Sequence, residues 1–487
     1  MSPKRTIYFV LGVFGLLALS MAFVPSDGVK MGEFTFHMPT FTEMFITSDE
    51  EYADITDIIE HDFDLDSLID MEMDSILLAP AEEKIRKASY DSLIQSIHKI
   101  EITDDGRKDL ARFFKKLKTD STARIMHYGD SQIEGDRITS YIRNKLQLKF
   151  GGTGVGLRPA VQPYDYILSA VQTHSENWTR YPIYGNVDSL VEHSRYGVMG
   201  AFSRYAPLTS DTIPFKDSVV YESELSISKS NISYLLTREY KQLRLFYGNS
   251  KRPVDFYLLA GGDTVYDGIL RQNLDYGMIS VKLPDSTSQV TIKFSGWDSP
   301  DIYGIDLGQA SGITMDNIAL RGSSGLIFTK ADSLHSAKMY KDLNPDLFIL
   351  QFGGNVMPYL QTQKSIKNYG QWFANQINRI KTLCPNAAVL VVGPSDMSTK
   401  KKDKFVTYEN LPGVVDALKE AALSTGCGYW DMYQAMGGHN SMPGWVNAEP
   451  ELARPDYVHF SERGAKLIAN MFYNALLLEY NNYLKKK

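Results

Sequence analysis

Two hydrophobic patterns divide this chain into an outer part and a middle part. In the outer part, short and largely apolar runs have the length of buried strands, at 124–128, 346–352, 387–392 and 428–432. Stretches with apolar residues three and four positions apart follow these runs, at 133–146, 364–383, 410–424 and from 461 onward. Strands that alternate with helices predict an α/β fold, with a parallel sheet covered by helices on both faces.

The middle of the chain, from about 160 to 310, has a different pattern. Short runs of alternating apolar and polar residues lie between turn-rich connectors, at 223–228, 242–247, 254–259, 278–283 and 289–294. This pattern predicts an antiparallel β-sandwich, of jelly-roll type, inserted into the α/β fold. Its many aromatic residues, such as Trp178, Tyr257 and Trp297, are suited to stacking on sugar rings. For any one of them, a place in the sandwich core is the better expectation.

The N-terminal segment carries an export pattern. Lys4 and Arg5 precede an unbroken apolar run from Ile7 to Val24, which predicts a signal peptide or a retained membrane anchor within residues 1–30. The length of the run favours the anchor, and either reading places the rest of the chain outside the cytoplasm. Residues 31–81 are then expected to form a flexible acidic spacer, because no Lys or Arg balances the carboxylates between residues 47 and 75.

Composition narrows the possible functions. With 487 residues and 43% apolar content, the chain has material for two or three packed domains. A formal net charge of −7 gives no basic footprint, so no nucleic-acid partner is expected. The histidines show no metal-ligand spacing, and we expect neither a metal nor a cofactor. The two cysteines, Cys384 and Cys427, either pair in an oxidising compartment or remain separate buried thiols.

Three short motifs carry candidate chemistry, each at the expected carboxyl end of a strand. They are Gly129-Asp130-Ser131, Gly353-Gly354-Asn355, and Asp456 followed three residues later by His459. Ligands of open α/β sheets bind at that edge. A serine at the first turn of a helix can serve as a cap alone, but a histidine able to take its proton makes it a nucleophile.

In this order, the motifs resemble those of the SGNH (GDSL-like) hydrolase family. The resemblance covers about 123–160 and 311–480, and it implies a three-layer, flavodoxin-like sheet. It assigns Ser131 as the nucleophile, His459 as the general base and Asp456 as the residue that orients the imidazole. It also assigns the oxyanion hole to the Ser131 N–H, Gly322 and the Asn355 amide. Val356 departs from the commoner pattern, in which an Asp follows the Asn.

Peptidoglycan O-acetylesterases of this class look similar in organisation as well. They interrupt the catalytic fold with a sandwich that resembles a carbohydrate-binding module. The expected domains are therefore a catalytic domain made of 82–160 and 311–487, and an inserted sandwich at 161–310. The loop 437–445 is expected to rim the pocket, which makes His439 and Trp445 candidate substrate contacts.

These observations predict an exported serine esterase that removes acetyl or other short acyl groups from a polysaccharide or a peptidoglycan-like glycan. Two alternatives remain open. The same triad could transfer the acyl group to a sugar hydroxyl, with residues 7–24 holding an uncleaved chain at the inner membrane. The chain could also be a non-catalytic envelope protein in which the sandwich binds glycan.

Overall fold

The computed structural model describes most of the chain, which forms two compact units. The described residues are 3–21, 29–31, 34–36, 52–60, 62–66, 92–119, 122–209, 218–285, 287–309 and 311–486. One unit is Met1–Glu51 and the other is Tyr52–Lys487.

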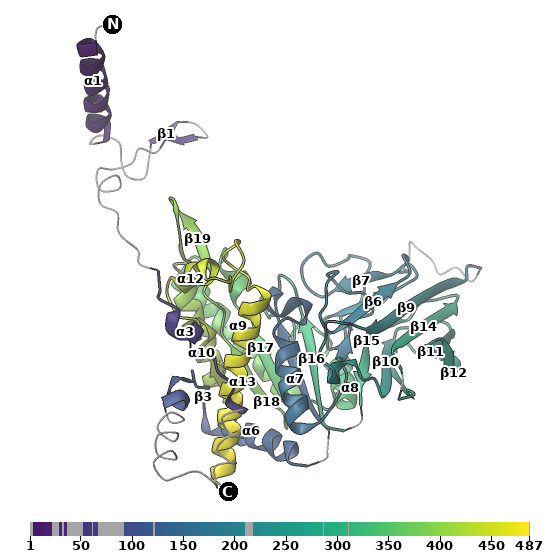
Figure 1. The fold of residues 1–487 in the computed structure, drawn as a ribbon. Helices are drawn as coiled ribbons and strands as arrows, with labels where there is room; N and C mark the ends of the chain where they lie inside the picture. The colour runs from purple at the N-terminus through teal and green to yellow at the C-terminus, as the bar shows by residue number, and fades with distance from the viewer. Residues whose placement is uncertain are drawn as a thin grey trace. The chain divides into compact units, whose positions relative to one another are not determined.

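The larger unit contains the predicted parallel sheet (Figure 1). The strand order across it is β16 (Ile313–Ala319), β4 (Ala123–Gly129), β17 (Leu347–Gln351), β18 (Ala388–Val392), β21 (Gly428–Trp430) and β3 (Glu101–Ile102). The first five are parallel to their neighbours, and only the short edge strand β3 is antiparallel. The predicted strands are confirmed. Cys384 and Cys427 are free, buried thiols beside this sheet.

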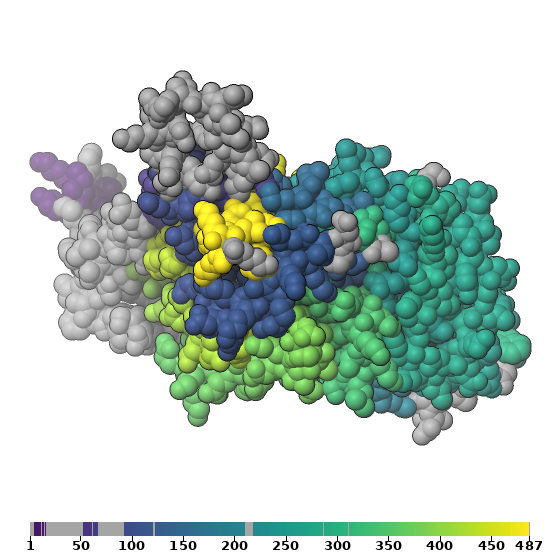
Figure 2. Space-filling model, turned by 90° about the horizontal axis from the view of Figure 1, so that it is seen from below, coloured from purple at the N-terminus to yellow at the C-terminus, as the bar shows by residue number. Residues whose placement is uncertain are grey.

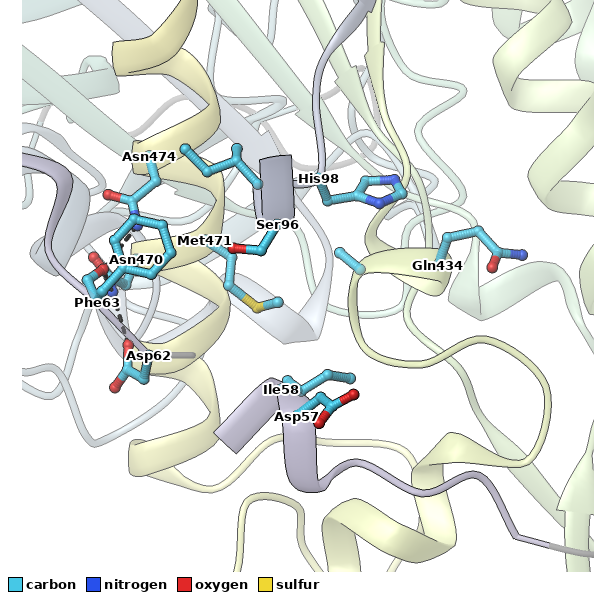
Figure 3. A pocket seen from close by; sticks show the side chains of 12 residues that line it. Asp57, Ile58, Asp62, Phe63, Ser96, His98, Gln434, Asn470, Met471 and Asn474 are labelled. Carbon is cyan, nitrogen blue, oxygen red and sulfur yellow. Dashed lines mark hydrogen bonds between the residues drawn. The ribbon is translucent and has the colours of Figure 1, made fainter. Parts of the chain in front are cut away.

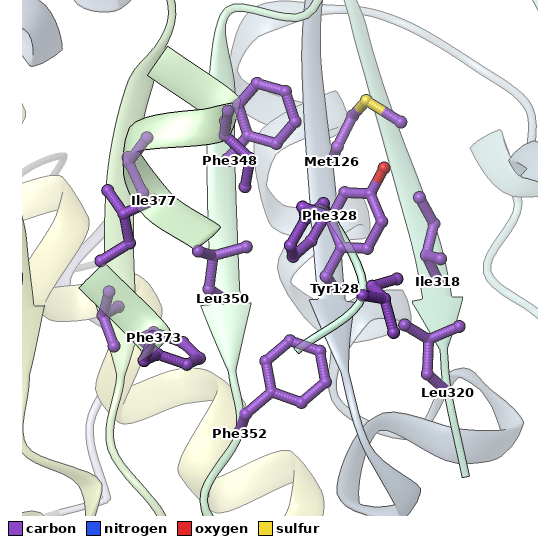
Figure 4. Packing of buried hydrophobic residues seen from close by; sticks show 14 of the residues in the cluster. Met126, Tyr128, Ile318, Leu320, Phe328, Phe348, Leu350, Phe352, Phe373 and Ile377 are labelled. Carbon is purple, nitrogen blue, oxygen red and sulfur yellow. The ribbon is translucent and has the colours of Figure 1, made fainter. Parts of the chain in front are cut away.

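Alternating side chains of the strands supply two separate cores, one on each face of the sheet. Met126 and Tyr128 of β4 point to one face, where they pack with Phe348 and Leu350 of β17 (Figure 4). The helices of this face are α8 (Ser333–Leu343), α9 (Gln363–Leu383) and α10 (Leu411–Ser424). Ile125 points to the other face, which is covered by α6 (Asp104–Leu117), α7 (Thr139–Phe150) and α13 (Glu462–Lys485). The predicted three-layer arrangement is therefore confirmed.

The middle of the chain forms two antiparallel sheets around a third core, as predicted for a sandwich. One sheet contains β13 (Gly277–Lys282), β10 (Gln242–Gly248), β15 (Asp301–Gly308), β8 (Ala201–Arg204), β7 (Thr179–Pro182) and β5 (Gly156–Arg158). The other contains β12 (Asp263–Leu270), β11 (Val254–Ala260), β14 (Gln289–Gly296), β9 (Tyr221–Lys229) and β6 (Ala170–His174). All five predicted sandwich strands are present. The fully buried β15 was not predicted, because its run of buried residues lacks the alternation of a half-exposed strand.

Ion pairs between arginine and aspartate side chains, as well as apolar packing, join the sandwich to the catalytic sheet. Arg124 of β4 donates to Asp306 of β15 at 2.7 Å and to Asp316 of β16 at 2.7 Å, and all three side chains are buried. Arg244 of β10 pairs with the second oxygen of Asp306 at 2.6 Å. Sandwich residues such as Phe202 also belong to the same core as the α8–α9 face of the sheet. Figure 2 shows the teal sandwich residues lying directly against the catalytic part.

The N-terminal unit contains helix α1 (Pro3–Met21) and a hairpin of β1 (Val29–Met31) and β2 (Phe34–Phe36). The described part of the predicted apolar run, from Ile7 to Met21, is helical in α1, and residues 22–24 of that run lie outside the described residues. In the described ranges, no helix is both long enough and apolar enough to cross a membrane.

The flexible spacer predicted for residues 31–81 is wrong for its described part between 52 and 66. Leu65 is fully buried, and the side-chain amides of Asn470 and Asn474 in α13 donate to Asp62 and Phe63 (Figure 3). Lysines of α7 neutralise the carboxylates, as in the 2.6 Å pair of Lys145 with Asp64. This segment packs because it finds apolar and basic partners far away in the sequence.

Candidate active site

Ser131, the predicted nucleophile, lies on a turn between β4 and α7. Ser131 begins a short 3₁₀ segment, η2 (Ser131–Asp136), and Gly135 breaks that segment with a φ of +69° that favours glycine. Helix α7 therefore begins only at Thr139, later than the periodicity predicts. The cap of η2 is the Asp130 carboxylate, which accepts the Gln132 N–H at 3.0 Å. Ser131 is thus not needed as a cap.

Ser131, His459 and Asp456 form a connected triad, as the motifs predict. The Ser131 Oγ lies 2.8 Å from the His459 Nε2, and the His459 Nδ1 lies 2.8 Å from the Asp456 Oδ2. With the Nδ1 proton held by the carboxylate, Nε2 is the acceptor that a serine proton needs. This geometry is that of an activated serine nucleophile.

The loop before α13 fixes Asp456 beneath the imidazole. The other carboxylate oxygen, Oδ1, accepts the backbone N–H groups of Val458 and His459, both at 2.9 Å. Partial burial opposes ionisation of Asp456, but these hydrogen bonds outweigh it and lower the pKa of the carboxyl. Tyr457, which lies between Asp456 and Val458 in the sequence, adopts a φ of +58°. Its ring stacks on Phe405 at a centroid distance of 3.7 Å. The carboxylate is therefore ionised and held in place around neutral pH.

The predicted oxyanion donors lie around the nucleophile. Asn355 sits in η4 (Gly354–Val356), after β17, and its Nδ2 donates to the Asp130 carboxylate at 3.1 Å and to the Ser323 carbonyl at 3.2 Å. Both amide hydrogens thus have acceptors, and an oxyanion must replace one of them. Gly322 lies in the loop after β16 with a φ of +76° and open space where a side chain would stand.

Asp130 is an unusual neighbour for this site. Burial raises the pKa of its carboxyl to about 6, although hydrogen bonds from Gln132 and Asn355 and the nearby His459 favour the ionised form. The sequence identifies Asp130 only as the middle of the Gly-Asp-Ser motif. In the structure, it joins the nucleophile turn to Asn355.

Two cavities of very different size open at Ser131. The small one has a volume of about 70 Å³ and is lined mainly by buried groups of the strand ends, among them Phe352, Pro394 and Met397. The large one, which we call the outer cleft, has a volume of about 650 Å³ and is bordered by Gly322, Asn355 and His459. Typical small-molecule sites measure roughly 300–1,000 Å³, so the outer cleft is of that size and the small cavity is well below it.

Arg137 is a site residue that sequence reasoning missed. Its guanidinium donates to three backbone carbonyls, those of Ser131 at 2.5 Å, Glu134 at 3.0 Å and Phe460 at 3.1 Å. Arg137 thereby ties the turn that carries Ser131 to Phe460, the residue that follows His459. No local motif marks such an arginine, because its partners are carbonyl groups that every residue has.

The two substrate contacts proposed from the loop 437–445 do not lie in either cavity. Trp445 is fully buried in helix α12 (Ser441–Asn447), where its indole N–H donates to the Met436 carbonyl at 2.8 Å and its ring packs on Phe460. Trp445 is therefore a core residue, and the prediction that it contacts the substrate is wrong. His439 is exposed and lines neither of the cavities at Ser131.

The fold of this chain resembles that of a solved structure. A peptidoglycan O-acetylesterase superposes on this chain with a TM-score of 0.59 and 20% sequence identity, over 78% of this chain and 96% of that protein. The fold is that of the SGNH hydrolases. An acetyl xylan esterase (16% identity) and a putative GDSL-like lipase from Parabacteroides merdae (14%) each cover 34% of this chain, and 81% and 74% of their own, with TM-scores of 0.27. No protein-family model matches the sequence, and neither does any curated protein.

Proposed function

We propose that this protein is an exported serine esterase that removes acetyl or similarly short acyl groups from a cell-envelope or extracellular polysaccharide. The observation that carries the proposal is the hydrogen-bonded triad of Ser131, His459 and Asp456, with 2.8 Å between each pair of partners. The peptidoglycan O-acetylesterase that shares the fold is consistent with this substrate class.

The two cavities support the division of the substrate into a small and a large part. The cavity of about 70 Å³ beside Ser131 suits a short acyl group, whereas a longer chain would meet the buried strand ends. The outer cleft of about 650 Å³ suits the sugar that carries the ester. Since Ser131 lines both cavities, an ester bond placed between them would lie close to this residue.

The reaction follows from the contacts of the triad. Ser131 Oγ adds to the ester carbonyl carbon while its proton passes to His459 Nε2, and the imidazolium is stabilised by ionised Asp456. The negative charge on the former carbonyl oxygen is held by N–H donors of Ser131, Gly322 and Asn355. Collapse breaks the bond to the sugar oxygen, which takes the proton from His459. Water, activated in the same way, then releases the acid and restores the serine.

Acetate release from p-nitrophenyl acetate and from acetylated polysaccharide would test the proposal. We expect Ser131→Ala and His459→Ala to lose on the order of 10⁴-fold in kcat, because the triad acts as a unit. His439→Ala is the matched control, since this second histidine lies outside both cavities. Equal rates for all four proteins would refute the esterase. Transfer of acetyl to a sugar acceptor faster than to water would instead identify a transferase.

A further inference from the structure

The outer cleft has one wall that comes from the inserted segment and not from the catalytic motifs. Tyr164, Asp165 and Tyr166, which follow β5, line this wall. Arg454, Asp456 and His459 line the cleft from the segment before α13. A ligand bound in the cleft would therefore touch the insertion and the triad at the same time.

The wall is fixed to the nucleophile turn through its backbone. The Leu168 N–H donates to the Gly135 carbonyl at 3.0 Å. A Cβ atom added at Gly135 would lie 3.3 Å from the Tyr166 carbonyl oxygen. The positive φ of Gly135 also favours glycine. Ser131 lies only four residues before Gly135 in η2. The contacts with Gly135 therefore hold Tyr166 at a set position relative to Ser131.

The two tyrosines of the wall differ in which groups lie against their rings. The Tyr164 ring is half-buried, with the Arg321 guanidinium 5.9 Å from its centre, and Arg321 itself is paired with Glu134 at 2.6 Å. Tyr166 is 53% exposed, and its hydroxyl donates a long hydrogen bond of 3.3 Å to Glu462. Its ring is thus a large apolar surface that faces solvent at the edge of a cleft.

From these observations, and resting on the proposed function, we infer that the Tyr166 ring is the platform of a sugar subsite that positions the acylated glycan over Ser131. A pyranose ring has a face of C–H groups that packs on an aromatic ring, whose face is electronegative. The hydroxyl groups at the rim of the sugar would lie among the polar groups of the cleft, including Asp165 and the exposed Arg454.

This assignment differs from stacking by aromatics of the sandwich itself. Trp178 is buried in the sandwich core, where it packs on Tyr205 and Phe294. Trp297 is 48% exposed, but it does not line either cavity at Ser131. Tyr166 combines exposure with a place in the outer cleft.

The test compares Tyr166→Ala, Tyr166→Phe and the control Trp297→Ala on two substrates. One is p-nitrophenyl acetate, which reports on the triad alone, and the other is an acetylated xylo-oligosaccharide or an O-acetylated peptidoglycan fragment. We expect Tyr166→Ala to lose about tenfold or more in kcat/KM on the glycan and less than about threefold on p-nitrophenyl acetate, because remote binding energy acts only on the larger substrate. Tyr166→Phe and Trp297→Ala should stay within about threefold of wild type on both.

The possible results are distinct. A Phe variant as impaired as the Ala variant would mean that the hydroxyl bond to Glu462 matters and the ring does not, which overturns the subsite. Unchanged glycan turnover by Tyr166→Ala also overturns it. Absence of p-nitrophenyl acetate hydrolysis by wild type would instead refute the esterase on which the subsite rests.

Discussion

Replacing Asp130 by Asn should make the stability of the protein less sensitive to pH. The folded carboxyl has its pKa raised to about 6 by burial, against 3.8 for an unperturbed Asp. Between these two values the folded state binds more protons than the unfolded state, so the free energy of unfolding falls as the pH rises. The difference of 2.2 pKa units corresponds to about 3 kcal/mol, of which about 2.5 kcal/mol is lost between pH 4 and pH 8.

Urea unfolding followed by tryptophan fluorescence at pH 4, 6 and 8 would measure this. We expect the stability of Asp130→Asn relative to wild type to improve by about 2.5 kcal/mol from pH 4 to pH 8, whatever its value at pH 4. The constant cost of altered hydrogen bonds cancels in this comparison. Asp456→Asn is the control, since the lowered pKa of Asp456 keeps its carboxyl ionised in both folded and unfolded states over most of this range, so the stability of this variant relative to wild type should change little between pH 4 and pH 8. A relative stability of Asp130→Asn that does not change with pH would refute the reasoning.

Two further predictions concern the connections around the site. Arg137→Ala should lower kcat by about 100-fold, because a displacement of the nucleophile turn by about 1 Å has such an effect. Added guanidinium ion should restore part of the rate. No rescue would indicate general damage to the fold. Asp306→Asn should destabilise the protein by about 3–5 kcal/mol in urea unfolding, since it leaves the buried Arg124 and the half-buried Arg244 without that carboxylate. A loss below about 1 kcal/mol would mean that the network contributes little.

The parts of the molecule that could be predicted from sequence are those set by local patterns. Strand runs such as 347–351 are buried on both faces and read as continuous apolar stretches, so their position follows directly from composition. The triad could be predicted because Ser131 and His459 each stand in a short motif at a strand or helix boundary. The order of the motifs then places them at one edge of the sheet.

The parts that could not be predicted depend on partners far away in the chain. Leu65 is one of several scattered apolar residues in the acidic stretch, and its burial depends on α13, whose position the sequence does not reveal. Trp445 resembles a rim residue because glycines surround it, yet its packing on Phe460 makes it core. Arg137 binds carbonyl groups, and no side chain in the sequence reveals them.

The separation of Ser131 and His459 also has a consequence for synthesis. The two residues are 328 positions apart, and Arg137 joins the nucleophile turn to a carbonyl in the same late segment. At roughly 5–20 residues per second, a ribosome needs about 16 to 66 s to reach the histidine after the serine has been made. During that interval the hydroxyl has no base, so the growing chain carries an inert serine. In the proposed esterase, ester cleavage can therefore begin only after the segment that carries His459 has been made.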